Sequence, residues 1–181
     1  MSKTKNFIFQ GKESFSSSKL DQIKNKFFKI NKFNTNIRSN EIYLVQSKSE
    51  KTNVDELKDV LSAKENDINF TFYVGPRLGT ISPWSSKTED IFKNVGFNVV
   101  SRAERLYGFL IETETDISNL DLSMFYDRMT QSIYINQEDF KDLFKLDNPS
   151  SLNHIKMIEK GKSELEQANE SFGFAMSNQE I

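Results

Sequence analysis

The order in which strand and helix patterns follow one another restricts the possible folds most strongly. Runs with apolar residues at every second position alternate with runs in which they recur at every third or fourth. The first half reads strand, helix, strand, helix (residues 6–11, 14–31, 41–47 and 53–63). From Ile68 the order becomes strand, helix, strand, strand, helix, strand, which is typical of split βαβ units. The sequence therefore predicts an α+β fold: a duplicated ferredoxin-like (split βαβ) pseudo-dimer domain.

Several boundaries of these elements can be predicted from capping residues and turn signals. Ser16, Ser17 or Ser18 caps the first helix, and Asn53 caps the second. Residues 85–97 are predicted as a helix that ends at Gly96. Residues 98–113 are predicted as two strands that meet between positions 105 and 108, and residues 132–135 as a last strand. Residues 119–131 are predicted as a helix with one apolar face, made of Leu122, Phe125 and Met129.

The composition changes after Ile135, where the chain becomes polar and rich in turn residues. A further helical pattern follows, with Leu165, Ala168 and Phe172 on one side, and the sequence stops shortly after it. We therefore expect an N-terminal domain over residues 1–136 and the truncated start of a helical linker over residues 137–181. The apolar side of that last helix suggests a missing partner or a missing continuation.

Composition excludes several kinds of function. The 181 residues include no cysteine and one histidine, His154, so no disulfide, cysteine nucleophile, thiolate metal site or histidine pair is expected. The net charge of −2 argues against nucleic-acid or membrane binding driven by bulk charge. Neither a signal peptide nor a membrane-spanning apolar run is visible, so we expect a cytoplasmic location. We predict no catalytic residue and no metal site in this chain.

Residues 75–86 hold two of the seven glycines, two of the three prolines and the single tryptophan. One interpretation is a structural connector, in which Pro76 and Pro83 stiffen the backbone and Trp84 anchors it to the core. Gly75 and Gly79 would then supply positive φ angles. The alternative interpretation is a site for an anion or an acidic partner, because a loop that opens a helix presents N–H groups to anions. The loop is no P-loop, because the GxxxxGK[ST] pattern is absent.

Charged and hydroxyl side chains make up the candidate site. The hydroxyl donors are Thr80, Ser82, Ser85, Ser86 and Thr88, and Arg77 and Lys87 add positive charge. In the following strand, Arg102 and Glu104 share one face and are expected to form a solvated ion pair. Arg105 lies on the other face and is expected to be a lone cation that is free to meet a partner.

These segments also resemble a known family. The loop GPRLGTISPWSSKTEDI, followed by NVGF, RAERLYGFLI and FYDRMTQSIY, closely resembles the N-terminal region of the large, single-chain phosphoribosylformylglycinamidine synthases of bacteria and eukaryotes. The form expected in the bacterial enzymes is TPRPGTISPWSSKATDI, so this chain departs from it at Gly75, Leu78 and Thr88–Glu89. The loop is the most specific part, and the resemblance extends more loosely over essentially the whole chain.

The resemblance implies a parent ligase of purine biosynthesis. That enzyme converts formylglycinamide ribonucleotide, ATP and glutamine into the amidine, ADP, phosphate and glutamate. Its N-terminal domain is similar to a fused dimer of a small subunit, and a helical linker, an ATP-dependent synthetase domain and a glutaminase with a Cys–His–Glu triad follow. ATP and Mg²⁺ would bind in the parent enzyme, and no cofactor is expected in this chain.

On this basis the chain is expected to be an inactive fragment that docks the synthetase and glutaminase domains and supports ammonia transfer. The residues expected to face those domains are Arg77, Thr80, Ser82, Trp84, Ser85, Ser86, Lys87, Arg102, Glu104 and Arg105. Two alternatives stay open. One is a free-standing anion- or nucleotide-binding module that uses the Arg77–Lys87 loop, and the other is a scaffold for a foreign partner.

Overall fold

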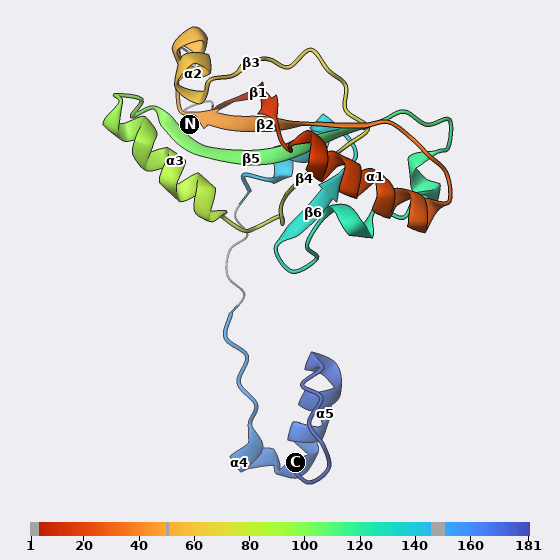
Figure 1. Ribbon diagram of the computed structural model, residues 1–181. Coiled ribbons are helices and arrows are strands. Elements are labelled where there is room, and N and C mark those ends of the chain that lie inside the picture. Colours follow the sequence, from red (N-terminus) through yellow and green to blue (C-terminus); the bar gives the residue numbers. More distant parts are fainter. Residues whose placement is uncertain (1–3, 50, 146–150) are drawn as a thin grey trace. The chain divides into compact units, whose positions relative to one another are not determined.

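The structure is a computed structural model, and it describes residues 4–49, 51–145 and 151–181. These residues belong to two compact units, which divide between residues 146 and 147 (Figure 1). The second unit contains α4 (Met157–Lys160) and α5 (Lys162–Phe172), with Ala168 buried against its neighbours. The helical pattern predicted around Leu165, Ala168 and Phe172 is therefore confirmed.

Six strands in the described part of the first unit form one sheet, in the order β3-β1-β2-β5-β4-β6. Every neighbouring pair is antiparallel. The strands are β1 (Lys5–Glu13), β2 (Ile37–Ser47), β3 (Lys64–Glu65), β4 (Phe72–Pro76), β5 (Val100–Ile111) and β6 (Gln131–Tyr134). The long strands β2 and β5 pair at the centre, and the short strands β3 and β6 close the two edges.

The sheet order shows an internal duplication. The first half runs β1, α1 (Ser17–Asn31), β2, α2 (Val54–Leu61), β3. The second runs β4, α3 (Pro83–Asn94), β5, the 3-10 helices η1 (Ile117–Asn119) and η2 (Ser123–Phe125), then β6. From either edge the sheet reads third strand, first strand, second strand of a half. The predicted α+β fold of the ferredoxin-like type, with its duplicated order, is confirmed.

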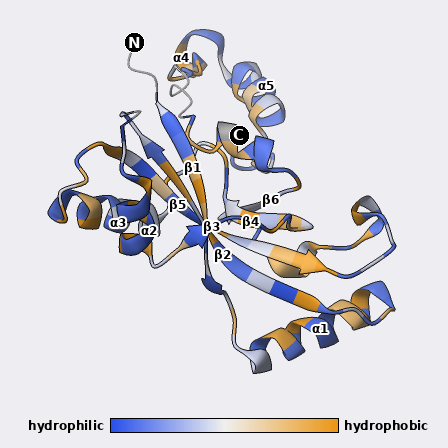
Figure 2. Cartoon of the chain, turned by 90° about the horizontal axis from the view of Figure 1, so that it is seen from above, coloured by the Kyte–Doolittle hydropathy of each residue, from blue (hydrophilic) through white to orange (hydrophobic). Residues whose placement is uncertain are grey.

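Two apolar clusters cover one face of the sheet, because alternate residues of each strand point to the same side. α2 and α3 contribute Leu57 and Phe92 to one cluster, over β1 and β2. α1 contributes Phe27 to the other cluster, over β4 and β5. Figures 1 and 2 show α2 and α3 at one end of the sheet and α1 at the other. The fold therefore rests on two similar cores joined by the central strand pair.

Two helix starts occur where the sequence predicts them. The Ser16 side chain accepts a hydrogen bond from the Lys19 amide and caps α1. The Asn53 side chain accepts from the amides of Asp55 and Glu56 and caps α2. Each cap satisfies amide groups that the first helical turn leaves without an internal partner.

The two strands predicted within residues 98–113 are wrong, because β5 is one continuous strand. It pairs with β2 from Val100 to Ile111 without a turn. Gly108, at the end of the predicted junction, lies within β5 and gives room to the Phe70 ring. A Cβ at Gly108 would lie 2.7 Å from that ring. This glycine therefore records a close tertiary contact rather than a reversal of the chain.

The helix predicted over residues 119–131 is also wrong. Three aspartate side chains each accept a hydrogen bond from the backbone amide two residues later in the chain. Asp116 accepts from Ser118, Asp121 from Ser123 and Asp127 from Met129. Such side chains offer the backbone an alternative to helical hydrogen bonds, so they favour turns. In place of an α-helix, this part of the chain forms the 3-10 helices η1 and η2. Met124 and Phe125 of η2 pack against the second apolar cluster.

The opposite face of the sheet is covered by η3 (Gln137–Asp142) and the segment before β4. Phe140 and Leu143 are buried there against Tyr73, Leu106 and Tyr134. These two residues lie beyond position 136, the predicted end of the N-terminal domain, yet they pack in the first unit. No helix in the described ranges is both long and apolar enough to cross a bilayer.

Candidate functional site

The loop between β4 and α3 is fixed to β5 through one serine. Ser82 is the N-cap of α3, since its Oγ accepts from the Ser85 amide at 3.0 Å and Pro83 occupies the first turn. The same hydroxyl donates to Glu104 Oε2 at 2.5 Å, and the Ser82 amide donates to Oε1 at 3.2 Å. The helix thus begins before residue 85, where the sequence placed it, because the serine cap and the proline set its first turn.

Arg102 and Glu104 form a buried ion pair under this loop. Arg102 Nη2 lies 2.7 Å from Glu104 Oε1, and the two side chains are 7% and 0% exposed. Nη2 also donates to the Thr80 carbonyl at 2.6 Å. The predicted solvated ion pair is therefore wrong, because the loop and the Phe144 ring cover it. Ser82 donates to Glu104, and the Thr80 carbonyl accepts from Arg102. These hydrogen bonds offset part of the desolvation cost of the two buried charges.

Trp84 anchors the loop on the helical face of the sheet. Its ring stacks on Tyr43 of β2 at 5.7 Å between centroids, with 6° between the planes. The Tyr43 hydroxyl donates to Glu41 Oε2 at 2.5 Å. Burial, and next the hydrogen bond to Glu41, raise the pKa of Tyr43 well above its usual range. The connector interpretation therefore identified the role of Trp84 correctly.

Gly75 and Gly79 have different structural roles in this segment. Gly79 has a φ of 76°, which supplies the predicted left-handed turn. Gly75 lies within β4 and needs no positive φ, so that part of the prediction is wrong. A Cβ at Gly75 would lie 2.8 Å from the Leu106 side chain, which explains a small residue at this position.

Arg105 is not the lone cation that the sequence suggested. Its Nη1 lies 3.3 Å from Glu41 Oε1 on the neighbouring strand. The guanidinium carbon lies 5.6 Å from the Trp84 ring centroid and 5.5 Å from that of Tyr107. Its Nε and Nη2 have no protein partner among the residues described, and the side chain is 32% exposed. Arg105 is thus held in place with one edge of its guanidinium still available.

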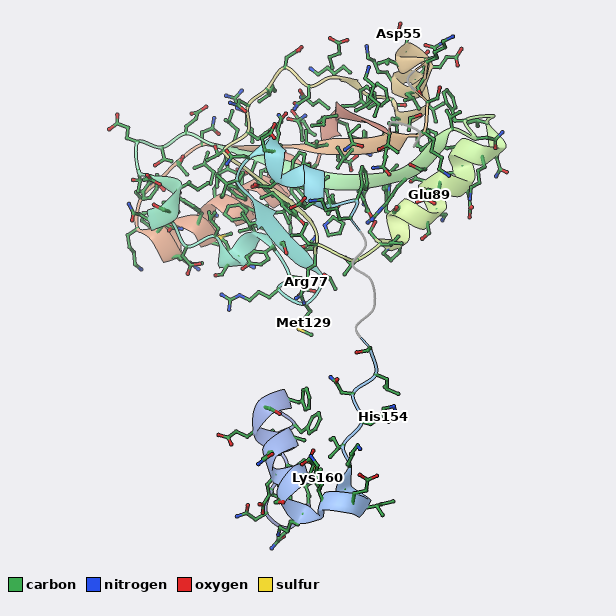
Figure 3. The ribbon with its side chains drawn as sticks, turned by 180° about the vertical axis from the view of Figure 1, so that it is seen from behind. Asp55, Arg77, Glu89, Met129, His154 and Lys160 are labelled. Carbon is green, nitrogen blue, oxygen red and sulfur yellow. The ribbon has the colours of Figure 1, made fainter. Side chains whose placement is uncertain are left out.

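A pocket of about 360 Å³ opens over this arginine. Arg105 and Tyr107 line it from β5, Trp84 and Ile81 from the loop and helix start, and Met129 from the turn before β6. Figure 3 shows Arg77 and Met129 close together at the same edge, where Arg77 Nη1 lies 3.5 Å from the Met129 carbonyl oxygen. The loop and the 129–131 turn therefore form the two sides of one site.

The loop, α3 and the turn before β6 expose apolar and cationic side chains, of which Ile81 and Met129 line the pocket. Leu78, Ile81 and Met129 are 53%, 51% and 79% exposed. Arg77 and Lys87 are exposed too, and within the described chain neither has a carboxylate partner at salt-bridge distance. Exposed apolar groups gathered beside unpaired charges are characteristic of interaction surfaces.

The ten predicted site residues divide into three groups by exposure. The exposed ones are Arg77, Thr80, Ser86 and Lys87. Ser82, Trp84 and Arg105 are half-buried. Ser85, Arg102 and Glu104 are buried and cannot face another domain across the surface, so for these three a direct contact is excluded. Their hydrogen bonds hold the loop instead, with Ser85 Oγ donating to Glu89 Oε1 at 3.3 Å.

Sequence reasoning missed the side chains from other elements that line the pocket or hold Arg105 and Trp84 in place. Glu41, Tyr43 and Tyr107 come from the central strands, and Met129 comes from the segment predicted as a helix. The alternation of Glu41 and Tyr43 was a usable signal, since residues two apart in a strand share a face. Their meeting with residue 105 depends on strand register, which the local pattern does not contain.

A buried tyrosine supports the other end of the loop. The Tyr134 hydroxyl of β6 donates to the carbonyl of Pro76, where β4 ends. Burial, and next the negative charge of Glu104, raise the pKa of Tyr134 to about 12. The neutral phenol therefore stays protonated at physiological pH and keeps the hydrogen bond that positions Pro76. Within the described ranges, no three His, Asp or Glu side chains gather as a metal site.

A comparison with protein-family models gives one match to this chain. The model is described as the formylglycinamide ribonucleotide amidotransferase N-terminal domain, and it matches residues 40–144. The match covers more than half of the 181 residues. It begins in β2, ends after η3 and includes the whole β4–α3 loop and every residue that lines the pocket.

Proposed function

Because the chain belongs to the formylglycinamide ribonucleotide amidotransferase N-terminal family of purine biosynthesis, we propose that its sheet unit is a non-catalytic assembly domain. It docks the synthetase and glutaminase domains of a phosphoribosylformylglycinamidine synthase. The parent enzyme is a carbon–nitrogen ligase that uses glutamine as nitrogen donor. Its ATP and Mg²⁺ bind in the synthetase domain, and the enzyme works in the cytoplasm.

The single observation that carries this proposal is the contrast within the β4–α3 loop. Its inner side is fixed by Glu104, Arg102 and the Trp84–Tyr43 stack. Its outer side exposes Leu78 and Ile81 beside unpaired cations. A loop that is ordered before binding loses little conformational entropy on docking, so rigidity of this kind favours a stable interface.

The same rigidity suits a role in ammonia transfer. Ammonia that leaves a glutaminase must reach the synthetase without escaping into water, so the interface between the domains has to exclude solvent. A fixed loop with an apolar rim can close such an interface better than a mobile one. In this proposal the buried residues hold the loop, and Arg77, Thr80, Ser86 and Lys87 make the contacts.

Complementation tests the proposal. The chain is mixed with a polypeptide that begins in the linker and carries the synthetase and glutaminase domains. Glutamine-dependent formation of the amidine is then measured with ATP and the ribonucleotide substrate. We expect no synthesis from this chain alone and restored synthesis from the mixture. Synthesis by this chain alone contradicts a non-catalytic domain, and silence of the mixture contradicts an assembly role.

A matched pair of variants tests the loop within that assay. We expect Arg77→Ala with Lys87→Ala to lower the restored glutamine-dependent rate roughly tenfold, since rim cations contribute to association. Arg38→Ala with Lys64→Ala removes the same charges from exposed positions of β2 and β3 and serves as control. If the loop variant retains the full rate and the full coupling to ATP use, the docking role of the loop is wrong.

The available guanidinium edge of Arg105 favours one second candidate, a module that binds a free anion or nucleotide. Such a module would gain thermal stability from its ligand by mass action. A rise in the melting temperature of this chain with inorganic phosphate or a nucleotide would support it. An unchanged melting temperature, together with restored synthesis in the mixture, would support the assembly domain.

A further inference from the structure

We propose that the pocket over Arg105 is a receptor for a single carboxylate side chain, flanked by a bulky apolar residue, on the polypeptide to which this domain docks. The inference rests on the proposed assembly function and adds the chemistry of the partner. Arg105 is the anchor that binds the carboxylate, and Ile81 and Met129 receive the apolar neighbour.

Arg105 is held in the geometry that carboxylate binding requires. Glu41 fixes Nη1 at 3.3 Å, and the rings of Trp84 and Tyr107 lie close to the guanidinium. Nε and Nη2 form the opposite edge, and the described residues offer them no partner. A guanidinium edge matches the two oxygens of a carboxylate in a bidentate pair. Since the side chain is already ordered, little further entropy is lost when the pair forms.

The local charges favour a carboxylate over a phosphate group. Glu41 is buried and carries the negative charge that Arg105 neutralises, and it accepts a second hydrogen bond from Tyr43. An incoming anion therefore experiences attraction from Arg105 and repulsion from Glu41 at short range. A monoanion tolerates this balance better than a phosphate dianion, whose third oxygen would also find no cationic partner on the pocket floor.

The walls of the pocket account for the apolar neighbour. Ile81 and Met129 are more than half exposed, and both line the pocket together with Pro76 and Pro83. Methionine adapts its shape to a partner better than branched residues do. A volume of about 360 Å³ accommodates one or two side chains rather than a large ligand.

Two exposed cations of the same loop and helix also favour an acidic partner. Arg77 and Lys87 are exposed on the loop and on α3, and the described chain pairs neither with a carboxylate. Two acidic groups of the same segments are engaged locally, since Asp127 accepts from Thr130 and Glu89 accepts from Ser85. The unpaired cations therefore steer an acidic segment toward the pocket and make its association sensitive to salt.

Trp84 allows a site-specific measurement because it is the only tryptophan in the chain. The full chain is labelled with 5-fluorotryptophan and mixed with the unlabelled polypeptide that carries the synthetase and glutaminase domains. We expect the ¹⁹F signal of Trp84 to shift on docking, and Arg105→Gln to weaken docking roughly tenfold. Arg105→Lys keeps the ion pair with Glu41 but lacks the planar fork, so we expect an intermediate loss. Arg38→Gln, an exposed arginine paired with Glu112, is the matched control.

Two small probes identify the chemical class with this chain alone. N-acetyl-leucyl-glutamic acid α-amide carries one side-chain carboxylate, and the glutamine counterpart has none. We expect only the glutamate probe to shift the Trp84 signal, and inorganic phosphate at equal ionic strength to leave it unchanged. Equal shifts by both probes, no shift by either, or displacement by phosphate overturns the carboxylate site. If complementation succeeds while Arg105→Gln docks normally, the assembly function stands and this inference fails.

Discussion

The two strand-to-helix connections of the duplicated sheet differ in a way that separates fold from function. Residues 14–16 join β1 to α1, and residues 77–82 join β4 to α3. Both connections end in a serine N-cap, Ser16 or Ser82. The first is short and places Phe15 against the rings of Tyr107 and Phe109. The second is longer, and only this one is tied to a buried ion pair.

The pockets beside the two connections differ in volume and in the residues that line them. The one beside α1 measures about 160 Å³, and its lining combines core rings such as Phe15 and Phe109 with Lys19, Gln22 and Lys26 of α1. The one beside α3 measures about 360 Å³ and contains Arg105. An aromatic anchor is therefore common to both halves and serves the fold. The longer loop, the buried ion pair and the arginine occur in the second half, which makes that half the candidate site.

The largest effect is expected from breaking the ion pair that distinguishes the second connection. Glu104→Gln leaves the Arg102 charge buried without its carboxylate, so the free energy of unfolding should fall by about 3 kcal/mol. Urea unfolding measures the change. Glu112→Gln breaks the exposed pair with Arg38 and should cost less than about 1 kcal/mol. Equal losses in the two variants would show that the loop's ion pair contributes no more than an exposed one.

Removal of either aromatic anchor, Trp84 or Phe15, should lower the free energy of unfolding by a similar amount. Trp84→Ala and Phe15→Ala each remove a half-buried ring from the sheet, and each should lower the free energy of unfolding by about 2 kcal/mol. Thermal or urea unfolding gives both values. Only Trp84→Ala should also impair docking, because Phe15 does not line the pocket over Arg105. Loss of docking in both variants would mean that overall stability, rather than the second loop, controls assembly.

Glycines at the ends of the first strand of each half sharpen the comparison further. A Cβ at Gly11 would lie 2.7 Å from the Tyr43 ring, and one at Gly75 would lie 2.8 Å from Leu106. Tyr43 is held by its stack on Trp84, whereas an aliphatic side chain adjusts more easily. We expect Gly11→Ala to cost about 2 kcal/mol and Gly75→Ala about 1 kcal/mol. Chemical denaturation that ranks the two in the reverse order would contradict a rigid Tyr43–Trp84 stack.

The last prediction concerns the change in stability at alkaline pH. The pKa of Tyr134 is about 12 in the folded chain, and an unfolded tyrosine titrates near 10. Above pH 10 the unfolded chain therefore binds fewer protons than the folded chain. The free energy of unfolding should fall between pH 10 and 12, by up to about 2 kcal/mol from this group.

Tyr43 titrates in the same direction, since its pKa is raised too. Tyr134→Phe should make the alkaline loss smaller than in the unmodified chain, although it also removes the hydrogen bond to Pro76. Unfolding curves recorded at several pH values measure the slope. An unchanged slope in the variant would show that Tyr134 titrates normally in the folded chain.

Local sequence determined the parts of this protein that depend on neighbouring residues alone. The sequence predicts one of Ser16, Ser17 and Ser18 as the first helix cap and Asn53 as the second, because short polar side chains reach amides of the next turn, and the cap is Ser16. The alternating runs gave the strands and the duplicated order, because side chains alternate between faces with a period of two. The site's loop was recognisable too, from its unusual concentration of proline, glycine and tryptophan.

Tertiary structure decided the burial and the ion pairs, because these depend on which distant segments pack together. The predicted junction between positions 105 and 108 is part of one strand, and Gly108 there leaves space for the Phe70 ring. Arg102 and Glu104 are buried because the loop and the Phe144 ring cover them, and Arg105 pairs with Glu41 across the β2–β5 pair. Burial and ion pairing arise from contacts between residues far apart in the chain, which local periodicity does not encode. The sequence alone therefore determined where the candidate loop lies, and the register of the two central strands decided which charged residues of β5 are buried and which keep an exposed edge.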